Sequence, residues 1–353
     1  MVLLNLLLII KMKLYNKIDR KILKEAIAKS DEQRVTLSFY SYYQLGNPSF
    51  FRDYLFLKYD ALQVYGRVYI ANEGVNSQIS VPNENWAAFV DVMREITFLA
   101  EARMNIAIED DGKSFYKLKI KLRTKIVADG LDDNSFDVTN AGNHVNAEQF
   151  NKITSNEDAI IVDMRNHYES EVGHFKDAIK PDVDTFRDAL PLVIEQLKNE
   201  KDKPIVMYCT GGIRCEKASA WLKHNGFNKV YQLDGGIIEY ARQAKEQGLE
   251  NKFIGKNFVF DERLGERITD EVIAVCHQCG NVCDSHTNCK NEACHLLFIQ
   301  CENCAEKHDG CCSKECANIF KLPEEEQREL RKGVKTKRNI FKKGRSKVLK
   351  FKK

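Results

Sequence analysis

The sequence lacks the features that would place a protein across a membrane or outside the cell. No apolar run reaches the roughly 20 residues that a helix needs to span a bilayer. The apolar opening MVLLNLLLII has no basic segment before it and no small-residue cleavage site after it, so it does not resemble a secretion signal. Met12 begins a second, more ordinary start, and the choice between Met1 and Met12 stays open. We therefore expect a cytoplasmic protein without a membrane partner.

Cysteine is absent from the sequence before residue 209. All twelve cysteines lie from Cys209 onward, and ten of them fall between Cys276 and Cys316. In a secreted protein such a cluster would predict disulfides, but a reducing cytosol favours metal ligands or reactive thiols. The chain has 353 residues, of which 43% are apolar, so it can form two or three domains with cores of their own.

The first part of the chain predicts a ferredoxin-like, or acylphosphatase-like, domain over 35–130, preceded by an extension and a helix over 1–34. Helices are expected over 47–63 and at NENWAAFVDVMREI. Strands are expected at VTLSFYSYY, GRVYIAN and VNSQISV, with a last one over RMNIAIE and KLKIKLR. This β-α-β-β-α-β order is that of the split βαβ unit, and the turn-rich stretch LDDNSFDVTNAGNH marks its end.

Strands and helices alternate over 145–250, which predicts an α/β domain with a parallel sheet. The strands are AIIVDMR, PIVMY and KVYQL, and the helices are TFRDALPLVIEQLKNE and IRCEKASAWLKHNG. Ligands bind at the carboxyl ends of strands in such sheets, and Cys209 lies at such an end. A small cysteine-rich module is expected over 251–322 and a basic, disordered tail over 323–353. The fold class is therefore a multidomain combination of α+β and α/β.

The stretch CTGGIR predicts a reactive thiol. A cysteine becomes nucleophilic as a thiolate, which needs backbone amides, a helix N-terminus or a cation close to the sulfur. The two glycines let N–H groups converge, the following helix directs its positive end at the loop, and the arginine adds a charge. The alternative is a small buried residue at the end of a strand. We assign the reactive role to Cys209 and Arg214, with loop backbone from Thr210, Gly211, Gly212 and Ile213.

Three stretches resemble rhodanese domains, namely CTGGIR, VDMRNHYESEVGHFKDA and YQLDGGI. In this resemblance Cys209 occupies the position of the persulfide-carrying cysteine. Related phosphatases have a loop one residue longer, whose arginine position is held here by Cys215. We interpret Cys215 as a packing residue, with a resolving thiol as the alternative. Asp163 and Arg165 are interpreted as supporting residues that organise loops.

Two further positions in the rhodanese-like signature are informative. We interpret His174 as a hydrogen-bonded structural histidine. Asp177 stands where the signature usually carries glycine, so the local turn at that position is an open question.

The knuckles CHQC and CENC predict a structural zinc site, because a two-residue gap lets both thiolates of a pair bind one tetrahedral ion. The ligands would be Cys276, Cys279, Cys301 and Cys304. Unmetallated or redox thiols and an iron–sulfur cluster are the alternatives. A second site is open, with a ligand set that spacing does not choose among Cys283, Cys289, Cys294, Cys311, Cys312, Cys316, His286, His295 and His308.

The last 27 residues carry a strong positive charge, with thirteen Lys or Arg against the single acid Glu329. Such a tail attracts polyanions, since contact with phosphates releases counterions. We expect it to bind RNA; the alternative is a solvated, disordered tail.

From about Val35 to about Cys316 the chain resembles the bacterial tRNA uridine(34) hydroxylase family of rhodanese-domain proteins. The resemblance is carried by segments such as GRVYIANEGVNSQIS, DMRNHYESEVGHF, IVMYCTGGIRCEKASAWLKHNGFNKVYQLDGGIIEYAR and CDSHTNCKNEACHLLFIQC. It implies an oxidoreductase that uses O2 as co-substrate to form 5-hydroxyuridine in the anticodon loop of tRNA. It also places the essential cysteine at Cys209.

The chemistry of such a hydroxylation stays open at this point. The sequence shows no G-x-G-x-x-G, no C-x-x-C-H and no recognisable facial triad of iron ligands, so no cofactor is assigned. Cys209 could add to C6 of uridine or carry persulfide sulfur as a reductant, and a sulfur or electron donor is a further expected partner. The segment 66–76 is a candidate wall of the base pocket, and packing within a sheet is its alternative. Competing functions are a plain sulfurtransferase and a non-catalytic RNA-binding adaptor.

Overall fold

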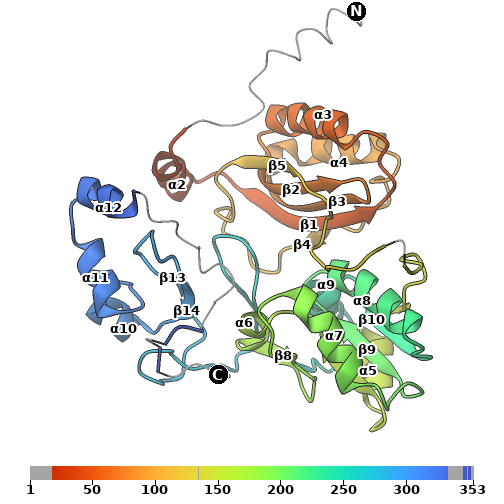
Figure 1. Ribbon diagram of the computed structural model, residues 1–353. Coiled ribbons are helices and arrows are strands. Elements are labelled where there is room, and N and C mark those ends of the chain that lie inside the picture. The colour runs from red at the N-terminus through yellow and green to blue at the C-terminus, as the bar shows by residue number, and fades with distance from the viewer. Residues whose placement is uncertain (1–17, 134, 333–344, 348, 351–353) are drawn as a thin grey trace, which may run out of the picture. The chain divides into compact units, whose positions relative to one another are not determined.

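The computed structural model describes residues 18–133, 135–332, 345–347 and 349–350 (Figure 1). The chain divides into two compact units. The first runs to Ala128 and includes Asp261–Arg263, and the second comprises Asp129–Phe260 and the chain from Leu264 onward. In the described part of the chain, no helix is both long enough and apolar enough to cross a bilayer.

The first unit is built on a five-stranded sheet with the order β4-β1-β3-β2-β5. Its strands are β1 (Arg34–Tyr42), β2 (Tyr65–Ala71), β3 (Gly74–Pro82), β4 (Asn105–Ile106) and β5 (Leu118–Leu122). Its helices are α2 (Arg20–Ala28), α3 (Pro48–Ala61) and α4 (Trp86–Glu95), the last preceded by the 3-10 turn η1 (Asn83–Asn85). The order β4-β1-β3-β2 with antiparallel pairing is that of the ferredoxin-like unit, so the predicted fold is confirmed.

The last predicted strand differs from the structure. Its two halves lie at opposite edges of the sheet, because β4 pairs with β1 while β5 runs parallel to β2. The connection between β4 and β5 includes Gly112, whose φ of 71° allows a turn that other residues adopt at a cost. Hydropathy alternation alone does not reveal such a break.

Helices α3 and α4 cover one face of this sheet (Figure 1). Their buried side chains, among them Leu55, Tyr59 and Phe89, pack against strand residues such as Phe39 and Val68. Because successive strand side chains point to opposite faces, Arg67 and Tyr69 of β2 and Lys119 and Lys121 of β5 belong to the other face.

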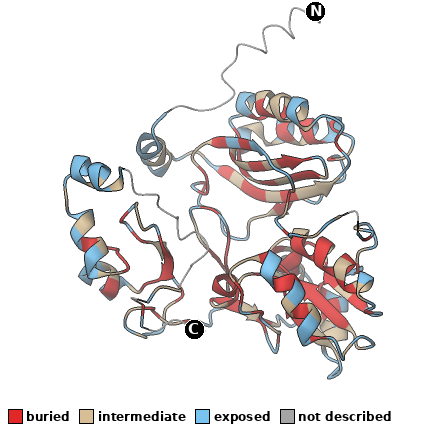
Figure 2. Ribbon diagram, viewed as in Figure 1, coloured by how far each residue is buried: buried red, intermediate tan, exposed pale blue. Residues whose placement is uncertain are grey.

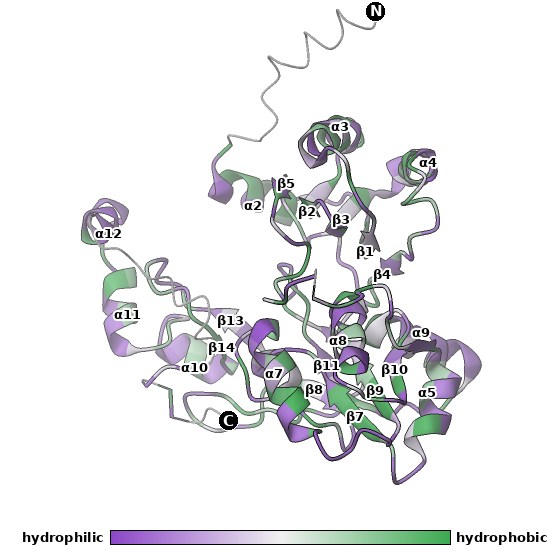
Figure 3. Cartoon of the chain, turned by 45° about the vertical axis from the view of Figure 1, so that its right-hand side comes forward, coloured by the Kyte–Doolittle hydropathy of each residue, from purple (hydrophilic) through white to green (hydrophobic). Residues whose placement is uncertain are grey.

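The second unit contains the predicted parallel sheet, with the order β6-β10-β9-β7. Three of its four strands are mostly buried and apolar (Figures 2 and 3), whereas the first two residues of the edge strand β6 are polar and exposed. They are β6 (Asn143–Val145), β7 (Ile160–Asp163), β9 (Ile205–Tyr208) and β10 (Val230–Leu233). The helices are α5 (Ala147–Thr154), α6 (His167–Ser170), α7 (Phe186–Gln196), α8 (Ile213–His224) and α9 (Gly236–Gln247). The edge strand β6 was not predicted, since two of its three residues, Asn143 and His144, belong to the polar, turn-rich stretch LDDNSFDVTNAGNH.

A second, three-stranded sheet has the order β12-β11-β8. It consists of β8 (Gly173–Phe175), β11 (Phe253–Asn257) and β12 (Glu266–Arg267). The cysteine-rich part follows, with the hairpin β13 (His286–Asn288) and β14 (Leu297–Ile299) and the helices α10 (Glu302–Lys307) and α11 (Lys314–Phe320).

The segment expected to be a disordered tail begins with a helix, α12 (Glu324–Arg331). Three glutamates in its first turn and two arginines in its last complement the helix dipole, and Arg328 pairs with Glu324 at 2.8 Å. Near the end of the chain, Leu349 is buried among cysteines of the module. The expectation of disorder is therefore wrong for these parts, while 333–344, 348 and 351–353 lie outside the described residues.

Candidate active site

Cys209 follows β9 directly, and α8 begins four residues later at Ile213. The side chain is buried, with the residue 1% exposed, whereas Thr210 and Gly211 are half-buried. The backbone N–H of Gly212 donates to Cys209 Sγ at 3.1 Å. Gly212 has a φ of 101°, which side-chain-bearing residues rarely adopt. This turn is what brings the amide back to the sulfur.

The N-terminus of α9 fixes the orientation of this loop. Ile237 N–H donates to the carbonyl oxygen of Cys209 at 3.0 Å, and Ile238 N–H donates to that of Thr210 at 3.3 Å. Gly236 permits this approach, because a Cβ at that position would lie 2.5 Å from Cys209 O and 2.6 Å from Thr210 O. The closing segment YQLDGGI therefore holds the loop through its carbonyl groups.

Several groups offset the cost of a negative charge on the buried Cys209 sulfur. Burial raises the pKa of this thiol, but the hydrogen bond from Cys215, the charge of Arg214 and the N–H groups of Arg214 and Gly212 lower it, to about 6. At neutral pH the thiolate is therefore the dominant form.

Cys215 is buried in the first turn of α8. Its thiol is hydrogen bonded to Cys209, and burial together with this hydrogen bond raises its pKa well above the usual range. Cys215 therefore remains protonated as the donor, and Cys209 is the acceptor. The sequence signal for this pairing is weak, since it consists only of a second cysteine in the first turn of the helix that follows the loop.

Arg214 has a partner that the sequence analysis did not assign. Its guanidinium donates to both carboxylate oxygens of the fully buried Glu169, at 2.7 and 2.8 Å. Nη2 also lies 3.4 Å from Thr210 Oγ1. Burial lowers the pKa of Arg214, but the charge of Glu169 raises it by more than that. The net pKa is therefore higher than that of an ordinary arginine, and the guanidinium stays charged. Cys209 and Glu169 thus share the Arg214 cation, and α6 fixes the position of the guanidinium through Glu169.

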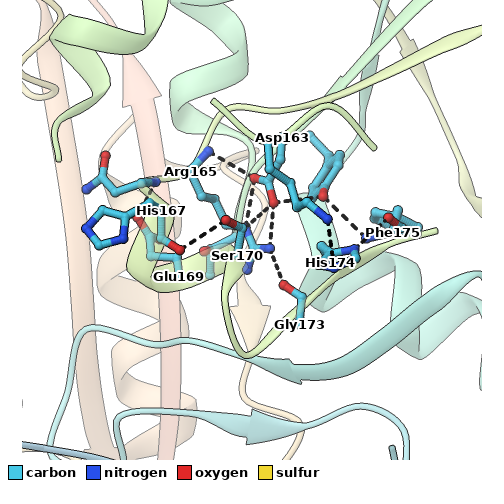
Figure 4. A network of polar contacts seen from close by, with 12 residues as sticks. Asp163, Arg165, His167, Glu169, Ser170, Gly173, His174 and Phe175 are labelled. Atoms are coloured by element: carbon cyan, nitrogen blue, oxygen red, sulfur yellow. Dashed lines mark hydrogen bonds and ion pairs between the residues drawn. The ribbon is translucent and has the colours of Figure 1, made fainter. Parts of the chain in front are cut away.

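Asp163 and Arg165 form a buried network beneath the site (Figure 4). Arg165 donates through Nη2 to Asp163 Oδ2 at 2.7 Å and to the carbonyl oxygen of Gly173 at 2.6 Å. Tyr208, the residue before Cys209, donates its hydroxyl to Asp163 Oδ2 at 2.7 Å. These contacts join the ends of β7, β8 and β9, which is a positioning role.

The two other signature positions also have structural contacts. His174 Nδ1 lies 2.9 Å from the carbonyl oxygen of Phe175, and its Nε2 lies 3.0 Å from Lys180 Nζ. Burial lowers the pKa of His174, which keeps the ring neutral. Asp177 adopts a φ of 61°, so the left-handed turn that glycine usually makes is retained with aspartate.

The structure brings together the four cysteines predicted as zinc ligands. The sulfur atoms of Cys276, Cys279, Cys301 and Cys304 all lie within 4.8 Å of one another. Cys279 Sγ and Cys301 Sγ are 3.6 Å apart. Zinc–sulfur bonds of about 2.3 Å in a tetrahedron place the sulfurs roughly 3.8 Å apart, so the donor set fits a single zinc ion.

The first of these knuckles contacts the helix that holds Arg214. His277, inside CHQC, has its Nε2 2.8 Å from Glu171 Oε1, at the end of α6. Tyr168 of α6 and the nearby Val172 belong to one buried cluster with Leu297 and Ile299 of β14. The cysteine-rich module therefore packs against the same short helix that carries Glu169.

Within the first unit, the face of the sheet away from the helices is basic. Lys119 and Lys121 are exposed on β5, next to Arg67 and Tyr69 on β2. Arg123 lies over the ring of Tyr69, 5.1 Å from its centroid. Burial lowers the pKa of Lys119, and the charges of Lys117, Arg67, Lys121 and Arg20 lower it further. We call Arg67, Tyr69, Lys119, Lys121 and Arg123 the basic sheet face.

Curated relatives match nearly the whole chain. A protein named tRNA uridine(34) hydroxylase from Enterobacter sp. (strain 638) is 54% identical over 336 residues, which are 95% of this chain and 96% of the relative. One of the same name from Photorhabdus laumondii subsp. laumondii is 56% identical over 336 residues, with the same coverage. The chain belongs to the tRNA uridine(34) hydroxylase family.

Three family models each match a separate range of this member of the hydroxylase family. The UPF0176 acylphosphatase like domain matches 34–126, the Rhodanese-like domain matches 146–243 and the Rhodanase C-terminal domain matches 254–317. A solved rhodanese-like domain from Anabaena sp aligns with 32% of this chain and 78% of its own, at 20% identity and a TM-score of 0.26.

We predict that Gly236→Ala disturbs the cysteine loop. Gly236 and Gly248 have similar positive φ angles, 65° and 64°, but only Gly236 would place a Cβ against backbone, whereas nothing lies within 4 Å at Gly248. Gly248→Ala should cost about 1 kcal/mol of unfolding free energy from strain alone. Gly236→Ala should cost more and should also slow alkylation of Cys209. Denaturant unfolding and mass spectrometry of the alkylated peptide measure both effects, and equal behaviour of the two variants would contradict the proposed contact.

Proposed function

We propose that this protein is an oxidoreductase of the cytoplasm that hydroxylates uridine 34 of tRNA at C5, with O2 as co-substrate and Cys209 as the reactive group. The observation that carries the proposal is the thiolate loop, in which a sulfur with a pKa of about 6 is held by amides and a shared cation. The name of the relatives, matched over 95% of the chain, supports the substrate and the reaction.

A thiolate gives uridine the reactivity that C5 lacks in the free base. Addition of Cys209 Sγ to C6 would form an S–C6 bond and leave the electron pair at C5, which attacks O2. One oxygen atom stays on C5, and the other leaves as water with two electrons and two protons from the electron donor expected as a partner. Loss of the C5 proton then breaks the S–C6 bond and releases the Cys209 thiolate. The alternative is a persulfide on Cys209 that acts as a reductant. Either route needs a base turned out of its stack, which favours an anticodon loop as substrate.

Replacing Cys209 tests this role directly. Cells that lack the protein and express Cys209→Ser or Cys209→Ala should contain no 5-hydroxyuridine in tRNA, because both sulfur routes are removed. Cys283→Ser is the matched control, since Cys283 lies outside the loop and is not one of the four cysteines predicted as zinc ligands. Mass spectrometry of tRNA nucleosides measures the outcome. Full hydroxylation with Cys209→Ala would rule out both routes.

The basic sheet face is the surface that we assign to tRNA contact. Exposed lysines neutralise phosphates, and the Tyr69 ring offers a stacking surface next to them. The basic tail, proposed from the sequence to bind RNA, falls largely on residues 333–344, which lie outside the described part of the chain.

We predict that Lys119→Ala combined with Lys121→Ala weakens tRNA binding about 10-fold at moderate salt and reduces its salt dependence, because two phosphate contacts are lost. The control pair is Lys198→Ala with Lys203→Ala, which removes the same charge from lysines that pair with nearby glutamates in the second unit. Filter binding over a salt series measures both variants. If the two pairs weaken binding equally, the assignment of this face is wrong.

We further propose that Cys276, Cys279, Cys301 and Cys304 hold a structural zinc ion. The four thiolates would complete its coordination, so no open position for catalysis is left. Its effect on the site would be indirect, through His277 and Glu171 at the end of α6.

A rhodanese sulfurtransferase is the second candidate function, favoured by the Rhodanese-like domain match over 146–243. Turnover of thiosulfate in the absence of tRNA would favour the sulfurtransferase. So would a thiolated tRNA product when tRNA is present. The third candidate, a non-catalytic RNA-binding adaptor, has no need of an ionised Cys209 beside Arg214.

A further inference from the structure

Four cysteines that the first knuckles leave out form a second cluster. The sulfur atoms of Cys289, Cys294, Cys312 and Cys316 all lie within 4.8 Å of one another. Cys294 Sγ is 3.7 Å from Cys312 Sγ, which in turn is 3.8 Å from Cys316 Sγ. These separations match the roughly 3.8 Å between thiolates bound to one tetrahedral zinc ion.

The second cluster repeats the hydrogen bonding of the first. In the first, the N–H of Cys301 donates to Cys276 Sγ at 3.4 Å. In the second, the N–H of Cys312 donates to Cys289 Sγ at 3.5 Å. Asn291 Nδ2 also donates to Cys316 Sγ at 3.4 Å. Donors directed at sulfur stabilise the thiolate form that metal binding requires.

We propose that Cys289, Cys294, Cys312 and Cys316 bind a second structural zinc ion, and that the two zinc sites are interleaved along the chain. The first site takes the first and third cysteine pairs, and the second site takes the second and fourth. Strand β14 runs between Cys294 of one site and Cys301 of the other. Each ion therefore constrains the segment that links it to the other, and metal binding supplies folding energy that this small hairpin lacks.

Metal content of the full chain tests this inference. Elemental analysis should find two zinc ions per chain, and no stoichiometric iron, in the wild type and in Cys283→Ser. Cys316→Ser should retain one zinc ion or none, and so should Cys279→Ser. One zinc ion in the wild type, with no change in Cys316→Ser, would overturn the second site.

Because the sites are interleaved, a single ligand variant can unfold the module, so a measurement on the wild type is needed as well. Titration with a thiol-modifying mercurial should release two zinc ions as eight cysteines react. Release of one ion as four cysteines react would overturn the inference regardless of how the variants fold.

Discussion

A negative charge on a sulfur atom buried at the end of β9 is the constraint on which the site depends. Cys209 is only 1% exposed, so water solvates that charge poorly and the protein must supply the compensation. It does so with the N–H of Gly212, the thiol of Cys215 and the guanidinium of Arg214. The backbone geometry follows from this need, because a positive φ at Gly212 and the close approach of Gly236 are both tolerated only by glycine.

The compensating groups are themselves held by the rest of the second unit. Arg214 is fixed by Glu169 on the four-residue helix α6, which is too short to be stable alone. That helix packs against β14 and contacts His277 at its end. The cysteine-rich module therefore supports the active-site loop indirectly, through α6. With two zinc ions in the module, metal binding would bear on the loop through these contacts, although no zinc ligand lies in it.

The local parts of this arrangement could be predicted from the sequence, and the long-range parts could not. The cysteine loop is contiguous, and alternation of strands and helices indicates the parallel sheet, so both were predicted. The pairing of Glu169 with Arg214 joins residues 45 apart, and hydropathy carries no signal for it. A second cysteine site was left open in the sequence without a ligand set, because its members do not form C-x-x-C knuckles and are selected only by the fold. The break between β4 and β5 was missed for the same reason, as strand pairing is a tertiary choice.

The pH dependence of Cys209 alkylation tests the central claim most directly. Iodoacetamide would be applied to the full chain from pH 4.5 to pH 9.5, and the rate for the peptide containing Cys209 followed by mass spectrometry. Because the environment lowers the pKa of this thiol, the rate should rise through a midpoint near pH 6 and level off by about pH 7. A rate that is still rising at pH 8, with a midpoint in the range of an ordinary thiol at about pH 8.5, would contradict the account.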